Sequence, residues 1–410
     1  MASRVERIEQ IEGSKAVARA VAACRPQVVA AYPISPQTHI VEEVSRLVRT
    51  GELTPCQYVN VESEFAAMSM CIGASAAGSR AYTATASQGL LFMAEALFNA
   101  SGLGLPIVLT VANRALGAPI NIWNDHSDSL SQRDSGWIQL YARDNQQAVD
   151  LHPLAFRLAE ELSLPVMVCM DGFVLTHAVE RVELPGQEAV DAFLPPFRPA
   201  QLLAPEQPMT IGAMVGPEAF TEVRYLAHTR HLRALTVLPR LAEEFRAAFG
   251  RDPHAVLGEA HLEPGGTVVL AMGSVLGTLA DAVDELRAEG LPVGLLGLTL
   301  YRPFPAEALR LALARAGRVV VLERALAPGV GGIVSADLAA ALHGLPDPPE
   351  IRTVIAGLGG RPITKASLCR MLADATAGRL PELLFLDLER DVVERESGLL
   401  EKAPDEEGAT

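Results

Sequence analysis

The stretch VVAAYPISPQTHIVEEVSRLV, residues 28–48, predicts a strand, a stiff turn and a helix in succession. Its apolar start is typical of a buried strand, which ends before Pro33. After Pro36, apolar side chains recur at helical spacing, and Gly51 predicts the end of that helix. Ser35 lies between the two prolines. It is either the N-cap of the helix, with Pro36 as the first helical residue, or a rigidly held hydroxyl at a binding site.

The same alternation of apolar strands and helical patterns continues through about residue 180 and resumes near residue 265. Strands joined by helices indicate parallel sheets covered on both faces. Between the two regions, residues 182–208 are rich in proline and lack periodicity, which predicts a linker or a strap over a neighbour. We therefore predict two α/β domains at residues 1–181 and 256–395, a linker with a helical segment at residues 182–255, and a polar tail at residues 396–410.

The composition excludes several classes of function. The chain has 410 residues, 49% of them hydrophobic, and a net charge of −15, which argues against a nucleic-acid partner. No apolar run has the length of a membrane span, and the charged first fifteen residues predict no signal peptide. The cysteines form no CxxC pair, which argues against a cluster or zinc site and fits a reducing cytoplasm. They are Cys24, Cys56, Cys71, Cys169 and Cys369.

The segment VNVESEFAAMSMCIGASAAG, residues 59–78, places two acids, Glu62 and Glu64, at the start of a helix. One interpretation is that they only interact with the helix dipole. However, the rest of this helix is made almost entirely of small residues, which lets a backbone or a flat ligand approach closely. A glutamate at its start could then share a proton with a ring nitrogen of that ligand.

A third segment, TVANRALGAPINIWNDHSDSLSQRDSGW, residues 110–137, begins where a strand is expected to end. A long loop with so many polar and aromatic residues is usually functional. Arg114, at the strand end, could hold a carboxylate with two parallel N–H groups. His126 could act as a base, although a structural role is the simpler interpretation. The Asp-His-x-Asp run of residues 125–128 leaves a metal site as a weaker alternative.

These segments carry a resemblance. AAYPISPQT, ESEFAA, TASQGL, NIWNDHSDSLSQRDSGWIQLYA and MDGFVLTH, followed by VVLAMGS, LYRPFP, LERALAPGVGG and GLGGRPIT, are similar to the alpha subunit of thiamine-diphosphate-dependent 2-oxoacid:acceptor oxidoreductases. Pyruvate:ferredoxin oxidoreductase is a member of that family. The motifs occur in order over nearly the whole chain. The resemblance implies a thiamine-diphosphate-binding parallel-sheet domain followed by a transketolase C-terminal-like α/β domain.

The resemblance also assigns roles to individual residues. The catalytic glutamate of the family, which binds the pyrimidine ring of the cofactor, matches Glu64. Pro33 matches a cofactor- and substrate-contacting proline, Ser35 a substrate-holding hydroxyl, and Arg114 the carboxylate-binding arginine. Many pyruvate-specific members have threonine in place of Ser35, which leaves the identity of the substrate open. The glycines of GSVLG and GVGG are interpreted as turn and packing residues, not as a dinucleotide motif.

The family implies CoA-dependent oxidative decarboxylation of a 2-oxoacid, with pyruvate as the default substrate and phenylglyoxylate or a branched-chain 2-oxoacid as alternatives. The chain shows neither a diphosphate- and magnesium-binding segment nor cluster cysteines. We therefore expect Mg²⁺ and 4Fe–4S clusters in partner subunits: a beta subunit that shares thiamine diphosphate, gamma- and delta-type iron–sulfur subunits, and ferredoxin or an NAD-reducing subunit. Two other classes are a non-catalytic assembly subunit and a transketolase-like carbon transferase.

Overall fold

The strand predicted at residues 28–31 forms part of a seven-stranded sheet in the computed structural model, which describes residues 5–206 and 208–400. The order of strands in this sheet is β12-β6-β7-β5-β4-β2-β3, and all neighbours except β12 run parallel. The strands are β2 (Val28–Ala31), β3 (Gln57–Asn60), β4 (Ala81–Thr85), β5 (Val108–Asn113), β6 (Ile138–Tyr141), β7 (Val166–Asp171) and β12 (Leu300–Arg302).

Helices cover both faces of this sheet, because β4, β5, β6 and β7 are buried at every residue and need apolar cover on each side. The helices are α1 (Gly13–Ala23), α2 (Thr38–Arg49), α3 (Glu64–Ala76), α4 (Ser87–Phe92), α5 (Ala94–Leu103), α6 (Ser127–Ser131) and α7 (Asn145–Leu162). The predicted parallel α/β architecture is therefore confirmed in the first half of the chain.

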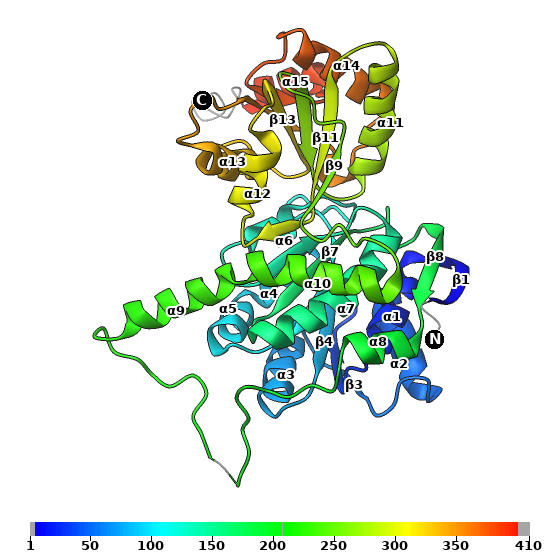
Figure 1. The fold of residues 1–410 in the computed structure, drawn as a ribbon, viewed down its shortest axis with the longest axis vertical. Coiled ribbons are helices and arrows are strands. Elements are labelled where there is room, and N and C mark those ends of the chain that lie inside the picture. Colours follow the sequence, from blue (N-terminus) through cyan, green and yellow to red (C-terminus); the bar gives the residue numbers. More distant parts are fainter. Residues whose placement is uncertain (1–4, 207, 401–410) are drawn as a thin grey trace, which may run out of the picture.

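A second, six-stranded sheet lies beyond the carboxyl edge of the first sheet, as Figure 1 shows. Its order is β15-β14-β13-β10-β11-β9, and only β9 is antiparallel to its neighbour. Its strands are β9 (Leu257–Ala260), β10 (Thr267–Ala271), β11 (Val293–Leu298), β13 (Arg318–Glu323), β14 (Glu350–Ile355) and β15 (Leu383–Phe385). Its helices are α11 (Val275–Ala288), α12 (Ala306–Leu313), α13 (Val334–Leu342), η1 (Leu358–Gly360) and α14 (Lys365–Thr376). The second predicted α/β pattern is likewise confirmed.

The prediction that residues 182–208 lack regular structure was wrong for their first part. β8 (Val179–Pro185) pairs antiparallel with β1 (Val5–Glu12), and α8 (Gln187–Phe193) follows. The irregular segment instead occupies residues 194–206 and 208–219 and leads to α9 (Phe220–Leu232) and α10 (Ala234–Phe249). This segment makes the long excursion at the bottom of Figure 1, and α9 projects from the body beside it.

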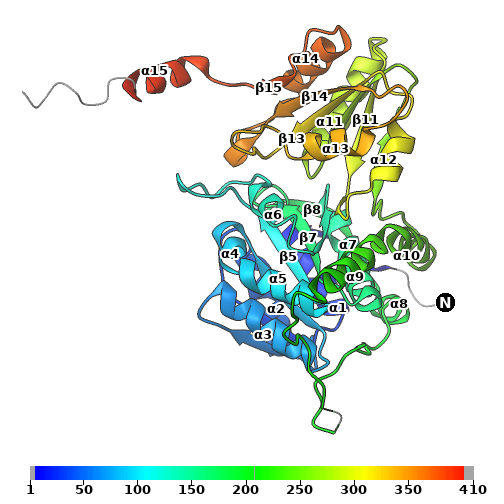
Figure 2. The same cartoon turned by 90° about the vertical axis from the view of Figure 1, so that its left-hand side faces the viewer.

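Two further differences concern helix ends. The N-cap position of α2 is Gln37 and not Ser35, and the Gln37 side chain donates to the Ala84 carbonyl at 2.6 Å. At the other end of the chain, α15 (Arg390–Leu400) extends into the predicted polar tail and projects from the second sheet in Figure 2. The remaining predicted tail, residues 401–410, lies outside the described residues. The division at residues 181, 255 and 395 stays a prediction.

The glycines of LERALAPGVGG have a packing role. Glu323, at the end of β13, is buried, and its carboxylate accepts from the backbone N–H groups of Ile333, Val334 and Ser335 at 2.7–2.9 Å. A Cβ atom at Gly332 would lie 2.3 Å from Glu323 Oε1. The glycine is therefore needed so that the start of α13 can approach the carboxylate, which agrees with the turn and packing interpretation.

A buried carboxylate joins the two sheets. Asp171 ends β7, and its Oδ1 atom lies 2.7 Å from His126 Nε2. Its Oδ2 atom accepts from Arg324 Nη1 at 2.7 Å and from the Ser274 backbone N–H at 2.9 Å. Arg324 and Ser274 follow β13 and β10 of the second sheet, while Asp171 and His126 belong to the first part of the chain. The carboxyl edges of the two sheets therefore meet at this cluster.

Burial alone would raise the pKa of the Asp171 carboxyl group, but the charges of Arg324 and His126 outweigh it and hold that pKa well below its usual range. A carboxyl group with a lowered pKa stabilises the folded state above its ordinary pKa, and this contribution is lost as the pH falls below it.

None of the helices in the described part of the chain combines the length and the apolar character that a membrane crossing requires.

We predict that Arg324→Met lowers the free energy of unfolding by about 3–5 kcal/mol, because it leaves a buried carboxylate without its main cation. Urea unfolding at pH 7 measures this change. Arg352→Met is the matched control, since Arg352 pairs with the half-exposed Glu350, and the control should lose no more than about 1 kcal/mol. The difference between Arg324→Met and the unsubstituted protein should shrink below about pH 4. Equal losses for both variants would contradict a special role for the Asp171 cluster.

Candidate active site

The predicted site residues lie at one edge of the first sheet. Pro33 and Ser35 follow β2, and Arg114 follows β5. Glu64 is the first residue of α3, which follows β3. Because the carboxyl ends of parallel strands meet at the same edge, four residues far apart in sequence come together there. The structure thus brings all four predicted residues to the edge where open α/β sheets bind ligands.

Glu64 is held in a closely packed environment. Ser63 is the N-cap of α3, and its side chain accepts from the Ala66 N–H at 3.2 Å, which fixes the first turn. Glu64 is only 7% exposed, whereas Glu62, two residues earlier, is exposed. A Cβ atom at Gly89 would lie 2.6 Å from Glu64 Oε1. The absence of a side chain at Gly89 therefore lets the Glu64 carboxylate reach the start of α4.

Thr85, at the end of β4, adds an unsatisfied polar group to this environment. The same Cβ atom at Gly89 would lie 2.5 Å from Thr85 Oγ1, so this hydroxyl and the Glu64 carboxylate both pack close to Gly89. Thr85 Oγ1 is buried and has no hydrogen-bond partner among the described residues. A buried hydroxyl without a partner is costly, and a ligand that bears donors and acceptors would satisfy it. A carboxylate and a hydroxyl around a glycine fit a polar aromatic ring such as a pyrimidine.

Arg114 donates hydrogen bonds to two backbone carbonyls, and the sequence did not indicate these contacts. Its Nη1 atom donates to the Ser35 carbonyl at 2.9 Å, and its Nε atom donates to the Asn121 carbonyl at 3.0 Å. Arg114 is 8% exposed, and burial lowers the pKa of its guanidinium group. Arg114 therefore ties the turn after β2 to the loop after β5. Ser35 contributes its carbonyl to this contact, while its side chain is exposed.

Asp128 is a positioning residue that sequence reasoning missed. Its buried carboxylate accepts from the backbone N–H groups of Ser87 and Arg114, both at 2.9 Å, from Asn113 Nδ2 at 2.8 Å and from the Ser129 N–H at 2.7 Å. It thereby fixes the start of α4 relative to the end of β5. Burial raises the pKa of the Asp128 carboxyl group to about 6, although the four donors oppose that shift. In the sequence, Asp128 was only one acid beside His126, because its partners come from distant strands.

The metal alternative at residues 125–128 finds no support in the geometry. His126 Nε2 contacts Asp171, and the Asp125 carboxylate accepts from the backbone N–H groups of Ser127 and Gly359, both at 3.0 Å. Asp128 faces N–H donors, as described above. Within residues 5–206 and 208–400, no group of three or more histidine, cysteine or acidic side chains could hold a metal ion. The structural interpretation of His126 fits its contact with Asp171.

The second sheet supports the loop after Arg114. Asn121 Nδ2 donates to the Gly359 carbonyl at 3.1 Å, in the turn GLGG that follows β14. Gly360 has a φ angle of 79°, and a Cβ atom there would lie 2.4 Å from the Cβ atom of Trp123. The turn thus needs glycine for its backbone conformation and for its close approach to the loop. The position of this loop at the candidate site therefore depends on both halves of the chain.

An exposed apolar surface lies beside Glu64. Phe65, the next residue of α3, is 38% exposed, and its ring lies 6.4 Å from the ring of Phe92 at the end of α4. Phe92 is 59% exposed and Phe98 of α5 is 47% exposed. Exposed aromatic side chains next to a buried polar site are typical of a surface that another chain covers.

Comparisons with known proteins agree with the motifs. Residues 19–241 match the family described as pyruvate flavodoxin/ferredoxin oxidoreductase, thiamine diP-binding, and residues 266–368 match pyruvate:ferredoxin oxidoreductase core domain II. The chain is 45% identical over 390 residues to pyruvate synthase subunit PorA of Methanosarcina barkeri, covering 93% of this chain and 97% of that protein. It is 41% identical over 365 residues to ketoisovalerate oxidoreductase subunit VorA of Pyrococcus abyssi, covering 89% and 92%.

Two solved structures share the fold. A 2-oxoglutarate:ferredoxin oxidoreductase from Magnetococcus marinus, solved with 2-oxoglutarate, coenzyme A and succinyl-CoA, has a TM-score of 0.68 at 21% identity. It covers 91% of this chain, which spans only 66% of that longer chain. A split-gene transketolase in an inactive beta4 tetramer has a TM-score of 0.52 at 14% identity and covers 90% and 99%. At these identities the comparisons concern the fold, and they confirm the predicted fold class.

We predict that Asp128→Ala lowers the free energy of unfolding by about 2–5 kcal/mol, because four buried donors lose their acceptor. A second variant, Asp128→Asn, keeps the shape of the side chain but cannot ionise, so it separates the effect of ionisation on stability from the effect of losing the side chain. Because the pKa of Asp128 is raised, its contribution to stability is present below its ordinary pKa and is lost as the pH rises toward about 6. The stability advantage of the unsubstituted protein over Asp128→Asn should therefore fall between about pH 4 and about pH 6.

Urea unfolding across that pH range measures both effects. Asp134→Asn is the control, because the Asp134 side chain is 76% exposed, and its stability difference should be small and independent of pH. An unchanged stability of Asp128→Ala would contradict the positioning role.

Proposed function

Because this chain belongs to the pyruvate flavodoxin/ferredoxin oxidoreductase family, we propose that it is the alpha subunit of a multi-subunit 2-oxoacid:acceptor oxidoreductase that acts on pyruvate. The proposed reaction is CoA-dependent oxidative decarboxylation to an acyl-CoA and CO₂, with electrons passed to iron–sulfur clusters of partner subunits. The observation that carries this proposal is the enclosed Glu64 carboxylate beside the unsatisfied Thr85 hydroxyl at the carboxyl edge of the sheet.

The proposed cofactor is thiamine diphosphate, which accepts the electron pair released when a bound 2-oxoacid loses CO₂. Glu64 would hold a proton at a ring nitrogen of the pyrimidine, and the glycine at position 89 permits the present position of its carboxylate. Thr85 would gain the partner that it lacks within the described residues. Pro33, at the end of the neighbouring strand, would line the same space. The burial of Glu64 and Thr85 and the position of all three residues at the strand ends support these proposed roles.

Arg114 and Ser35 are proposed to hold the substrate. Two N–H groups of Arg114 are occupied by the Ser35 and Asn121 carbonyls, which fix the guanidinium group at the mouth of the site. Its Nη2 atom is then the donor best placed for a substrate carboxylate. The exposed Ser35 hydroxyl lies at the same turn. Substrate binding would therefore be coupled to the loop after β5 through one side chain.

The site is proposed to be completed by partner subunits. The exposed aromatic side chains beside Glu64 suit a beta subunit that binds the diphosphate and Mg²⁺. The similar proteins are themselves named as subunits. Gamma- and delta-type subunits with 4Fe–4S clusters, ferredoxin or an NAD-reducing subunit, and coenzyme A as co-substrate complete the proposal. The five cysteines are free in the structure, which fits the reducing cytoplasm proposed for this enzyme.

A branched-chain 2-oxoacid is the second candidate substrate. The chain is 41% identical to a protein named ketoisovalerate oxidoreductase subunit VorA, close to its 45% identity to a PorA subunit. The loop after Arg114 begins with small residues, Ala115, Gly117 and Ala118, which would leave room for a branched side chain. The higher identity to PorA places pyruvate first. Phenylglyoxylate remains an alternative within the same chemistry.

We predict that Glu64→Gln abolishes turnover in the purified native complex, because glutamine cannot exchange a proton with the pyrimidine. The assay follows reduction of ferredoxin or a dye with a panel of 2-oxoacids and CoA, and pyruvate should give the highest kcat/KM. Glu62→Gln is the matched control, since Glu62 is exposed at the same helix start, and it should retain full activity. Substantial turnover by Glu64→Gln in an intact complex would remove Glu64 from the mechanism.

We predict that Arg114→Lys raises KM for the 2-oxoacid about tenfold or more, since lysine cannot bridge two carbonyls and also present a donor to a carboxylate. Steady-state kinetics with pyruvate measures this change. Arg240→Lys, on the exposed face of α10, is the control and should leave KM unchanged. An unchanged KM for Arg114→Lys would mean that another residue holds the carboxylate.

A further inference from the structure

A hollow of about 440 Å³ lies at the opposite end of the first sheet from Glu64. It is lined by Ser101 near the end of α5, by residues 133–136 before β6, by Leu164 before β7, and by residues 302–304 at the end of β12. Since β6 and β7 start here, the hollow is at the amino edge of the parallel sheet, whereas the candidate active site is at the carboxyl edge. Its volume is within the range of small-molecule sites.

Helix α9 forms the outer wall of this hollow with an unusual arrangement of side chains. Arg224, His228 and His231 all line the hollow, and their spacing of four and three residues places them on one helix face. Tyr225 and Leu226 of the same helix are more than 60% exposed instead. A surface helix normally turns its apolar face inward. Here Arg224 and the two histidines face the hollow, together with Ala227 and Leu232.

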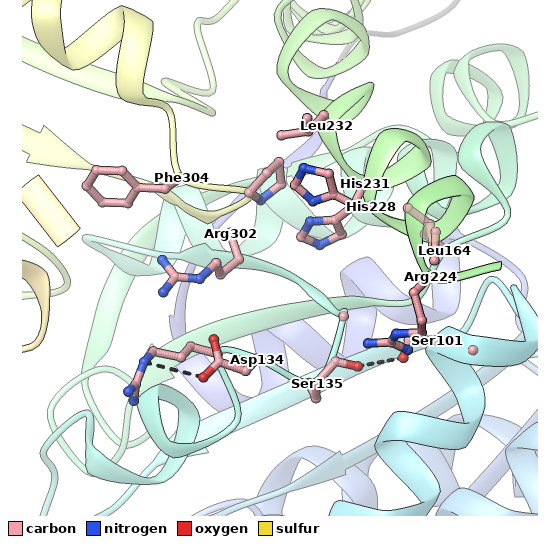
Figure 3. A pocket seen from close by; sticks show the side chains of 15 residues that line it. Ser101, Asp134, Ser135, Leu164, Arg224, His228, His231, Leu232, Arg302 and Phe304 are labelled. Atoms are coloured by element: carbon pink, nitrogen blue, oxygen red, sulfur yellow. Dashed lines mark hydrogen bonds and ion pairs between the residues drawn. The ribbon is translucent and has the colours of Figure 1, made fainter. Parts of the chain in front are cut away.

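The rest of the lining contains two more arginines. Arg133 and Arg302 line the hollow, and Asp134 is the one acidic side chain among its lining residues. Arg302 pairs with Asp337 at 2.8 Å, and Arg133 lies 3.9 Å from Asp134. Arg224 lies in no ion pair with the described residues and is exposed. Figure 3 shows Asp134, Arg224 and Arg302 around the hollow, with the two histidines of α9 on one side. The hollow thus has an excess of positive charge.

His231 adds a specific hydrogen-bonding requirement. Burial lowers the pKa of His231 to about 4, although a backbone hydrogen bond with Trp137 opposes that shift and the positive charge of Arg302 adds to it. The imidazole is therefore neutral at pH 7. Its Nε2 atom is buried and has no hydrogen-bond partner among the described residues. When the other ring nitrogen carries the proton for the Trp137 contact, Nε2 is an acceptor, and a ligand hydroxyl would satisfy it.

We propose that this hollow binds a phosphate ester of a small polyol, with the phosphate paired to Arg224 and His228 and a hydroxyl donating to His231 Nε2. Phe304 and Leu232 supply an apolar wall on the same hollow. Two classes of ligand carry both a phosphate ester and a hydroxyl group. One is a sugar phosphate, and the other is a nucleotide, whose base would pack on Phe304. Because α9 has no buried residue, such a ligand would add contacts between α9 and the sheet and would reduce the opening of this helix.

The test uses the full chain and, separately, the native complex. Isothermal titration calorimetry with inorganic phosphate, ribose 5-phosphate and AMP should show that both esters bind more tightly than phosphate. AMP binding more tightly than ribose 5-phosphate would identify the nucleotide class, and the reverse order the sugar phosphates. Hydrogen exchange should slow in residues 220–232 when the ester is present.

Arg224→Glu should weaken ester binding about tenfold or more, because it places a like charge against the phosphate. Arg233→Glu is the matched control: it makes the same charge reversal at the end of α9 but outside the hollow, and it should leave binding unchanged. In the complex, Arg224→Glu should leave KM for CoA and for the 2-oxoacid unchanged.

Three results would overturn the proposal. The first is that neither ester binds to the full chain. The second is that both arginine variants weaken ester binding equally, and the third is that the free chain binds the ester but the native complex does not. A raised KM for CoA in Arg224→Glu would contradict it too, because it would show that the hollow takes part in binding CoA.

Discussion

The buried Asp171 carboxylate is the contact on which the candidate site depends. It lies at the end of the inner strand β7 and contacts groups from both halves of the chain, so the two carboxyl edges are held face to face. A second contact of Arg324, from Nη2 to the Asn124 side chain at 2.8 Å, extends this cluster into the loop that follows Arg114. A buried carboxylate is stable there only because its charge is matched. The orientation of the loop therefore follows from an ion pair between the two halves of the chain.

The strand and helix pattern of both halves could be predicted from the sequence, because apolar runs and helical spacing are local signals. The position of the site at the carboxyl edge of the first sheet could be predicted too, since every candidate residue follows a predicted strand. The distinction between Glu62 and Glu64 could not be made from local signals, because it depends on Gly89, which lies in the next helix. The resemblance assigned Glu64, and burial gives a physical reason for that assignment.

The elements that sequence reasoning missed all depend on contacts between distant residues. β1 has apolar residues only at every third position, Val5, Ile8 and Ile11, so it shows no strand alternation, and its partner β8 lies more than 160 residues away. β12 is a three-residue strand from the second half of the chain that completes the first sheet. Local patterns carry no information on such pairings.

The two edges of the first sheet differ in how their buried polar groups find hydrogen-bond partners. At the carboxyl edge, Asp171 and Asp128 are buried carboxylates whose acceptors are all matched by donors from the chain, which makes that edge rigid. Several buried polar atoms there have no partner among the described residues: Thr85 Oγ1, Asn113 Oδ1, Asn124 Nδ2 and Arg324 Nε. Thr85 is the one that we propose to meet the cofactor. At the amino edge, His231 Nε2 is unsatisfied and the neighbouring arginines exceed the acids. A buried polar group that has no partner in the described part of the chain and that belongs to the lining of a hollow, as His231 Nε2 does, indicates where a ligand contributes the missing partner.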